Sequence, residues 1–197
     1  MSLIVLFLLL LPGLVAAQGL TDVQYTLLHD DITITHASEF QASVAAADYQ
    51  PIADAYNLLA TGPFWVWRTS LTPKEIYEAT ADGGGTWSWS TYKAQTQQER
   101  DAWRDMMAPN LLNPSLKQTR DGWLAIFGGQ GASQVQVNYL LALSRRQARR
   151  GEALLATTTS GNGSTATPAT LTYEGLITWI DVNHAVSGAP LPGGPRP

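Results

Sequence analysis

The sequence predicts a domain that is mainly α with a small β element (α+β), preceded by an apolar N-terminal arm and followed by an extended C-terminal tail. Three observations support this fold class. Apolar residues recur at helical spacing in several segments, the longest of which is 132–156. Helix-start signals, such as the capping box Thr72-Pro73-Lys74-Glu75, stand at the head of these segments. Only short runs are β-branched or aromatic enough to form strands.

The helices are predicted from caps and apolar periodicity together. Thr21-Asp22 can cap a first helix in which Val23, Leu27 and Leu28 share one face. The predicted helices cover 22–31, 51–60, a segment from Pro73 to the Asp82-Gly83-Gly84-Gly85 loop, 90–107, a segment from Asn113-Pro114 to Phe127-Gly128-Gly129, 132–156, and a short helix capped by Thr178. In the helix over 90–107, Trp103, Met106 and Met107 are expected to face the core.

Short strands are expected between these helices. Ile32-Thr33-Ile34-Thr35 alternates and is β-branched, which indicates a short strand or an extended connector. Phe64-Trp65-Val66-Trp67 and Thr170-Leu171-Thr172-Tyr173 are similar runs, and such strands can pair as a small sheet. Residues 157–168 form a polar loop.

The chain length and its ends define three parts. A chain of 197 residues can form one domain with a substantial core. We therefore expect an arm or membrane-active segment over 1–20, a compact, mainly helical globular domain over 21–187, and a Pro/Gly-rich tail over 188–197. The tail, GAPLPGGPRP, has no helical or strand potential and is expected to be extended or disordered.

The arm is strongly apolar, since eleven of residues 3–17 are Leu, Ile, Val or Phe. Three interpretations stand beside one another. Val15-Ala16-Ala17 resembles the cleavage site of a secretory signal peptide, although Met1-Ser2 supplies no basic residue. A transmembrane helix from Leu3 to Leu20 would be about 27 Å long, just short of a hydrocarbon core of about 30 Å, and would contain Pro12-Gly13. A retained arm buried in a protein assembly and later released into a membrane is the third. The side chains expected to contact a membrane or a partner are Leu3, Ile4, Val5, Leu6, Phe7, Leu8, Leu9, Leu10, Leu11, Leu14 and Val15.

The charges are few and unevenly distributed. Charged residues make up 14% of the chain, the net charge is −4, and no Lys or Arg precedes Arg68. Residues 1–67 contain six acidic residues and no basic one. This asymmetry is compatible with an assembly in which the acidic face of one copy meets the basic face of another, and equally with a protein whose two differently charged faces have no special role. The balance gives no general attraction to nucleic acid, and we expect no sequence-specific nucleic-acid binding. The absence of cysteine excludes disulfides and thiolate metal sites.

No catalytic or cofactor motif is found in the sequence. His29, Asp30, Asp31 and His36 form the one His/acid cluster, and a helix end and a strand are expected to keep His29 and His36 apart. Gly128-Gly129-Gln130-Gly131 lacks the Gly-Lys-Ser/Thr of a P-loop, and nothing ties a histidine to Ser133 as a base. We therefore expect a protein that is not an enzyme and has no cofactor and no metal.

Two groups of residues are candidate interfaces. Tryptophans are preferred anchors in cores and interfaces, and Trp87-Ser88-Trp89 would place two indoles on one face of an extended segment. Four arginines are expected on one side of the 132–156 helix, where they can be solvated, contact phosphate or anionic lipid, or pair with the acidic part of another copy. The candidate interface residues are Trp65, Trp67, Trp87, Trp89, Arg145, Arg146, Arg149 and Arg150.

A set of short motifs resembles a known family. The motifs are Ala55-Tyr56-Asn57, Val66-Trp67-Arg68-Thr69-Ser70, Asn113-Pro114-Ser115, Arg120-Asp121, Ile126-Phe127-Gly128-Gly129, RRGEALLA over 149–156 and PATLTYEG over 168–175. Their order over about residues 20–186 resembles small virion proteins of tailed bacteriophages, including the tail-associated proteins of short-tailed phages. The arm and the Pro/Gly tail depart from the family pattern.

The resemblance implies a non-enzymatic particle component near the portal, adaptor and tail. The expected partners are other phage tail, adaptor or portal proteins, further copies of this chain in a homo-oligomeric ring, and the host membrane. The expected location is the virion tail region, with the host cell envelope reached during genome ejection, when the arms insert or extend a channel. The competing hypothesis is a bacterial secreted or membrane-anchored envelope protein with an aromatic face that binds glycan or a partner.

Overall fold

The computed structural model describes residues 19–156 and 160–191, so residues 1–18 of the arm, with the side chains from Leu3 to Val15, and most of the predicted tail lie outside the described residues. The fold is mainly α-helical with a small two-stranded antiparallel sheet, which confirms the predicted class. In chain order the elements are α1 (Asp22–Asp30), the π-helical turn η1 (Asp31–Thr35), α2 (Ala37–Ala45), α3 (Gln50–Asn57), β1 (Trp65–Trp67), α4 (Pro73–Glu78), α5 (Trp89–Ala94), α6 (Gln97–Met107), α7 (Lys117–Phe127), α8 (Ala132–Leu143), β2 (Arg145–Gln147), α9 (Arg150–Leu155) and α10 (Trp179–Ser187).

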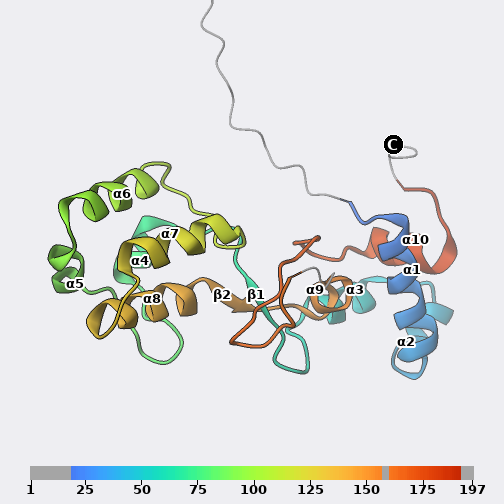
Figure 1. Cartoon of the computed structure of the whole chain (residues 1–197). Helices are drawn as coiled ribbons and strands as arrows, with labels where there is room; N and C mark the ends of the chain where they lie inside the picture. Colours follow the sequence, from blue (N-terminus) through green and yellow to red (C-terminus); the bar gives the residue numbers. More distant parts are fainter. Residues whose placement is uncertain (1–18, 157–159, 192–197) are drawn as a thin grey trace, which may run out of the picture.

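The helices gather in two lobes with the sheet between them (Figure 1). We call residues 68–144, with α4 to α8, the aromatic lobe, and residues 19–60, 149–156 and 173–191, with α1, η1, α2, α3, α9 and α10, the terminal lobe. The sheet and the segments around it form the junction. Because the aromatic lobe is inserted between β1 and β2, the terminal lobe is assembled from both ends of the described chain.

The terminal lobe is held together by an aliphatic core. Its most deeply buried side chains come from α1, η1, α3, α9, α10 and the segment before α10: Leu28, Ile32, Ile52, Tyr56, Leu155, Ile177 and Val182. Asn57 joins the two ends of the chain, since its amide donates to the Ile177 carbonyl at 2.8 Å and accepts from the Ile177 amide at 2.9 Å. Capping boxes at Thr21 and Thr178 begin α1 and α10.

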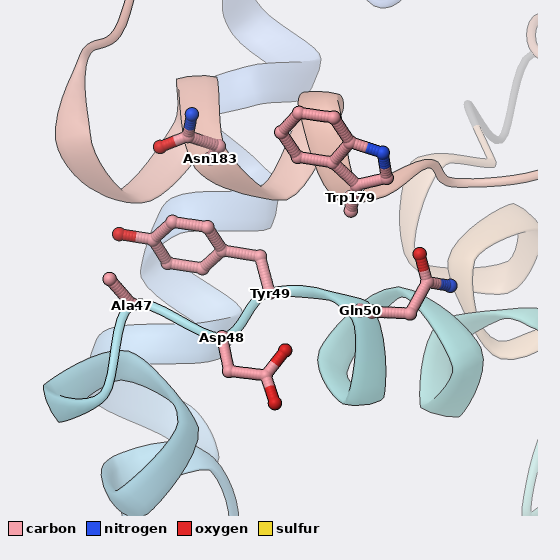
Figure 2. A pocket seen from close by; sticks show the side chains of 6 residues that line it. All are labelled: Ala47, Asp48, Tyr49, Gln50, Trp179 and Asn183. Carbon is pink, nitrogen blue, oxygen red and sulfur yellow. The ribbon is translucent and has the colours of Figure 1, made fainter.

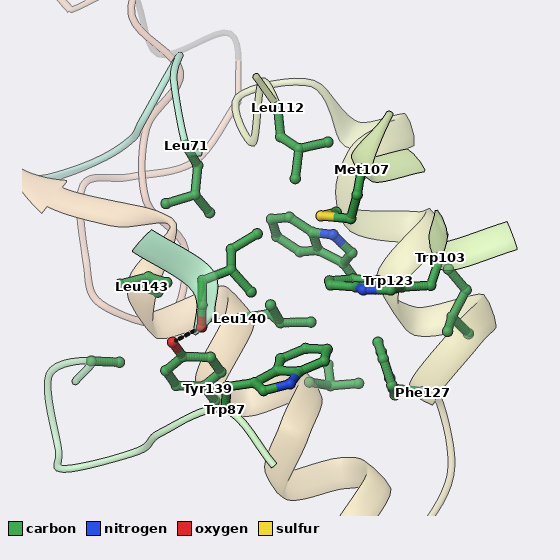
Figure 3. Close-up of a cluster of buried hydrophobic side chains, with 14 residues drawn as sticks. Leu71, Trp87, Trp103, Met107, Leu112, Trp123, Phe127, Tyr139, Leu140 and Leu143 are labelled. Carbon is green, nitrogen blue, oxygen red and sulfur yellow. Dashed lines mark hydrogen bonds between the residues drawn. The ribbon is translucent and has the colours of Figure 1, made fainter. Parts of the chain in front are cut away.

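The aromatic lobe is built around stacked rings (Figure 3). Trp87 stacks on Trp103 with centroids 5.0 Å apart, and Phe127 meets the Trp103 ring edge-on at 5.2 Å. Tyr139 reaches across the core and donates to the Ile76 carbonyl at 2.5 Å. Trp103 and Met107 are buried as predicted, whereas Met106 is half-buried and packs at the edge of this core.

The junction rests on three chain segments. β1 pairs with β2 in the register Trp65–Gln147, Val66–Arg146 and Trp67–Arg145. On the other edge of β1, the Trp67 amide donates to the Ala169 carbonyl at 3.0 Å, and the Ala169 amide donates to the Trp65 carbonyl at 2.9 Å. The predicted strand over 170–173 is therefore wrong, because pairing on this side is limited to an isolated bridge between Ala169 and Val66.

The single helix predicted over 132–156 is also wrong, because the chain leaves helical geometry at Ser144. The Ser144 hydroxyl donates back to the Leu140 carbonyl at 2.5 Å, an interaction that often bends helices. The Ser144 carbonyl accepts from the Arg68 amide at 2.8 Å. Residues 145–147 then enter the sheet, and α9 starts at Arg150. Apolar periodicity continues on both sides of this interruption, which is why the sequence reads as one helix.

Three other predicted boundaries differ from the structure. Ile32–Thr35 is not extended but continues α1 as a π-helical turn, since Ile32 is buried in the terminal core and this burial outweighs β propensity. The predicted 90–107 helix divides at Gln95, because Thr96 forms a capping box with Glu99 and starts α6 anew. The helix expected from Asn113-Pro114 starts only at Lys117. The Asn113 side-chain oxygen accepts a hydrogen bond from the Ser115 amide at 3.0 Å, which forms a local turn before the helix.

Candidate functional site

The four arginines predicted on one helix side do not share a face. Arg145 and Arg146 lie on β2, Arg149 precedes α9, and Arg150 is its first residue. Arg146, Arg149 and Arg150 each pair with a carboxylate of the same chain. The predicted basic helix face is therefore wrong, because the break at Ser144 turns these residues in different directions.

Arg146 and Glu152 form the most buried ion pair of the junction. The guanidinium donates to both Glu152 oxygens, at 2.7 and 2.8 Å, and the Arg149 amide donates to the same carboxylate at 2.9 Å. Burial acts to raise the pKa of Glu152, but these hydrogen bonds outweigh it and hold the pKa below its usual value. Arg146 also donates to Glu174 at 2.8 Å, so it links β2 to α9 and to the segment before α10.

Arg150 joins α9 to the acidic N-terminal part of its own chain. It donates to both oxygens of Glu39, at 2.7 and 3.0 Å, and these bonds lower the pKa of that carboxyl. Its guanidinium lies 4.7 Å from the centre of the Tyr56 ring, and the Tyr56 hydroxyl donates to Asp31 at 2.5 Å. The sequence leaves open a pairing of the basic and acidic regions between copies, and at Arg150 this pairing occurs within one chain.

Trp65 and Trp67 point to the same side of β1, and each is covered by a guanidinium. Arg145 lies 5.4 Å from the centre of the Trp65 ring, and Arg120 lies 4.3 Å from that of Trp67. Arg120 donates to the carbonyls of the segment before α7, and Arg145 donates to the Thr165 carbonyl at 2.6 Å. Neither guanidinium pairs with a carboxylate among residues 19–156 and 160–191. These contacts fix the junction and leave the two rings half-buried.

The rings of Trp87 and Trp89 contact each other, but they do not lie on one face of an extended segment as predicted. Trp87 belongs to the aromatic core, whereas Trp89 is the first residue of α5 and remains half-exposed. Trp89 contacts Tyr77, Trp87 and Tyr92, with ring centroids 5.0 to 5.9 Å apart. Its exposed edge is therefore the rim of an aromatic cluster.

An exposed apolar stripe runs along α1 and η1 and consists of Val23, Leu27 and Ile34. Val23 is 70% exposed and Ile34 is 71% exposed. The opposite side of the same helix carries the fully buried Leu28 and Ile32. Val23 and Leu27 therefore do not share a face with Leu28 as predicted. The helix is apolar on two sides, and a helix of this kind is normally covered on both.

An open groove lies between α10 and the turn that joins α2 to α3 (Figure 2). Its volume is about 540 Å³, and it is lined by Ala47, Asp48, Tyr49, Gln50, Trp179 and Asn183. Figure 2 shows Trp179 and Asn183 projecting from successive turns of α10 above Tyr49. No local sequence pattern indicates this groove, because its two walls are separated by about 130 residues in the chain.

The described residues contain no constellation that binds a metal ion. Within 19–156 and 160–191, no three His, Asp or Glu side chains converge for that purpose. The predicted His/acid cluster divides into a His29–Asp30 pair at 3.0 Å and a His36–Asp31 pair at 3.1 Å. In the same ranges, no helix is both long and apolar enough to cross a bilayer.

Comparisons of the chain with protein-family models, with curated proteins and with solved structures find no match.

Proposed function

We propose that this chain is a structural protein of a tailed-phage particle, attached in the portal, adaptor or tail region, where copies assemble into a ring. The order of its motifs supports this proposal, since it resembles small virion proteins of tailed phages. The observation that carries it is the stripe of Val23, Leu27 and Ile34. A helix that has already packed one apolar side into its own lobe presents a second apolar side to solvent.

The energetics of the stripe favour a protein partner. Full burial of a Val, Leu or Ile side chain contributes about 1.5–3 kcal/mol, so covering the three side chains contributes several kcal/mol to an association. Single exposed apolar residues are ordinary on protein surfaces. Val23, Leu27 and Ile34 recur at spacings of four and seven residues along α1 and η1, with the exposed Asp30 between the last two. Exposed apolar residues that gather in this way mark contact sites.

The stripe directly follows the apolar arm in sequence. Leu20 is buried in the terminal lobe and anchors the start of α1, one turn before Val23. An assembly that covers α1 thereby brings together the arms of neighbouring copies. We propose that the arm side chains Leu3 to Val15 act on the host membrane when the genome is ejected, by insertion or by extension of a channel.

The oligomeric state tests the role of the stripe. The double variant Val23→Ser/Ile34→Ser should fold normally, since both side chains are exposed, but it should dissociate in light scattering coupled to gel filtration. The matched control is Leu58→Ser/Leu59→Ser, because these side chains are 68% and 61% exposed but lie at the end of α3. Equal oligomer mass for both double variants and the unaltered chain would refute an assembly role for the stripe.

Liposome flotation tests the arm. The full chain should float with vesicles, and a chain without residues 1–20 should remain at the bottom of the gradient. If the two behave alike, the membrane role is wrong.

The Val15-Ala16-Ala17 sequence favours the alternative of an exported envelope protein. N-terminal sequencing of native protein separates the two hypotheses, because cleavage after Ala17 supports export and an intact Met1 or Ser2 supports a retained arm.

A further inference from the structure

We propose that the groove between α10 and the α2–α3 turn binds a neutral saccharide. The groove has a volume of about 540 Å³, which lies within the range of small-molecule sites and is open enough for one unit of a longer chain. This inference does not depend on the proposed function, since a particle component and an envelope protein can each bind glycan.

Two aromatic rings, those of Tyr49 and Trp179, border the groove, and neither stacks on another ring of the described residues. Trp179 is 49% exposed and makes no ring contact within the described part of the chain. Trp89 is a useful comparison, because it is 51% exposed, is also the first residue of a helix, and packs against three other rings. Tyr49 is half-buried against the terminal core, and its ring lies below Asn183, to one side of the Trp179 ring (Figure 2). Aromatic faces of this kind suit the C–H faces of a sugar ring.

The groove offers both donors and acceptors that have no partner in the described residues. Within 19–156 and 160–191, the Asp48 carboxylate accepts no hydrogen bond, and the Tyr49 hydroxyl and the Trp179 indole N–H donate none. The Asn183 amide oxygen accepts from Ser187 at 2.7 Å, which leaves its NH₂ group available. Sugar hydroxyls both donate and accept, so they can satisfy this mixed set, whereas an alkylammonium group offers donors alone.

The charge of the lobe argues against an anionic ligand. The terminal lobe contains nine acidic and two basic residues, and both basic residues pair with carboxylates of the chain. Among residues 19–156 and 160–191, no Lys or Arg lines the groove, and Asp48 contributes a negative charge at its edge. A phosphorylated or sulfated ligand would be repelled, so a neutral saccharide is the ligand that fits the charge and the hydrogen-bonding groups together.

The turn that presents Asp48 and Tyr49 has an unusual backbone. Ala47 has φ +52°, a left-handed conformation that side-chain-bearing residues rarely adopt. The Asp48 amide donates to the Ser43 carbonyl at 2.9 Å and the Ala47 amide to the Val44 carbonyl at 3.1 Å, so the turn closes the C-terminus of α2. This closure fixes the direction in which Asp48 and Tyr49 leave α2.

Saturation-transfer NMR tests the proposal with the full chain, kept in solution by a detergent that has no sugar headgroup. The probes are glucose, galactose, mannose, N-acetylglucosamine and their β1–4-linked dimers, with choline chloride and sodium phosphate as charged comparisons. We expect at least one neutral sugar to bind with a dissociation constant on the order of 1 mM. Trp179→Ala should weaken that binding by about tenfold or more, Asp48→Asn should weaken it by less, and the matched control Trp89→Ala should leave it unchanged.

Three results would overturn the proposal. They are the absence of signal with every neutral sugar, binding that Trp179→Ala and Asp48→Asn leave unchanged, and binding of choline or phosphate in place of the sugars. Circular dichroism confirms that each variant is folded. Asp48→Asn alters an exposed side chain and therefore stays informative if Trp179→Ala is unstable. Neither variant alters the stripe on α1, so both should keep the oligomeric state of the unaltered chain. A loss of sugar binding without a change in oligomeric state therefore concerns the groove alone and not the assembly role of the stripe.

Discussion

Replacement of Glu152 by Gln should destabilise the protein by about 3 kcal/mol. The Glu152 side chain has no exposed surface and accepts two hydrogen bonds from Arg146, at 2.7 and 2.8 Å. Gln retains one acceptor oxygen and turns an NH₂ group toward the guanidinium. Removing one partner of a buried ion pair costs about 3–5 kcal/mol. We expect the lower end of this range, because Arg146 is 27% exposed and keeps Glu174 at 2.8 Å.

Urea unfolding at neutral pH, followed by circular dichroism, measures this cost. The matched control is Asp121→Asn, which removes an exposed pair with Lys117 at 2.6 Å, and such pairs contribute about 0–1 kcal/mol. If Glu152→Gln lowers the free energy of unfolding by no more than Asp121→Asn does, the ion pair does not hold the junction and the reasoning is wrong.

Three further predictions concern stability. The pKa of Glu152 lies below its usual value of 4.5, so its contribution to stability is present above about pH 4.5 and is lost as the pH falls through the folded-state pKa. Urea unfolding should show a loss of stability below about pH 4.5 that Glu152→Gln reduces, and equal pH profiles for the two proteins would contradict this. Gly151→Ala would place a Cβ 2.7 Å from Ile177 and should lower the thermal midpoint at a cost of about 1–3 kcal/mol, whereas Gly62→Ala, which meets open space, should leave it nearly unchanged. Ala47→Gly should raise the free energy of unfolding by up to about 1 kcal/mol by relieving the left-handed conformation, and a clear loss of stability would show that the turn is not strained.

Local chemistry in the sequence was sufficient to predict much of the helical framework. Thr72 and Thr178 form the expected capping boxes, and α4 and α10 begin where these residues place them. The aromatic run at Trp65–Trp67 forms a strand as predicted. Signals of this kind extend over a few residues, so a single sequence contains them in full.

The errors arose where long-range contacts decide the local conformation. The helix ends at Ser144, whose carbonyl accepts from the amide of Arg68, 76 residues earlier. No residue close to Ser144 in the sequence indicates this contact. The exposed stripe and the groove could not be predicted for the same reason, because both depend on long-range packing. The direction in which Val23 and Ile34 face depends on which side of α1 meets α10 and α9, and Trp179 borders a groove only because α10 packs beside the α2–α3 turn.

We propose that the chain is built into a tailed-phage particle through the α1–η1 stripe. The most direct measurement is quantitative mass spectrometry of density-purified particles that carry either the unaltered chain or Val23→Ser/Ile34→Ser. We predict a fixed multiple of copies per particle for the unaltered chain and a strong loss for the stripe variant, while Leu58→Ser/Leu59→Ser is incorporated normally. Absence of the unaltered chain from purified particles, or full incorporation of the stripe variant, would contradict the account.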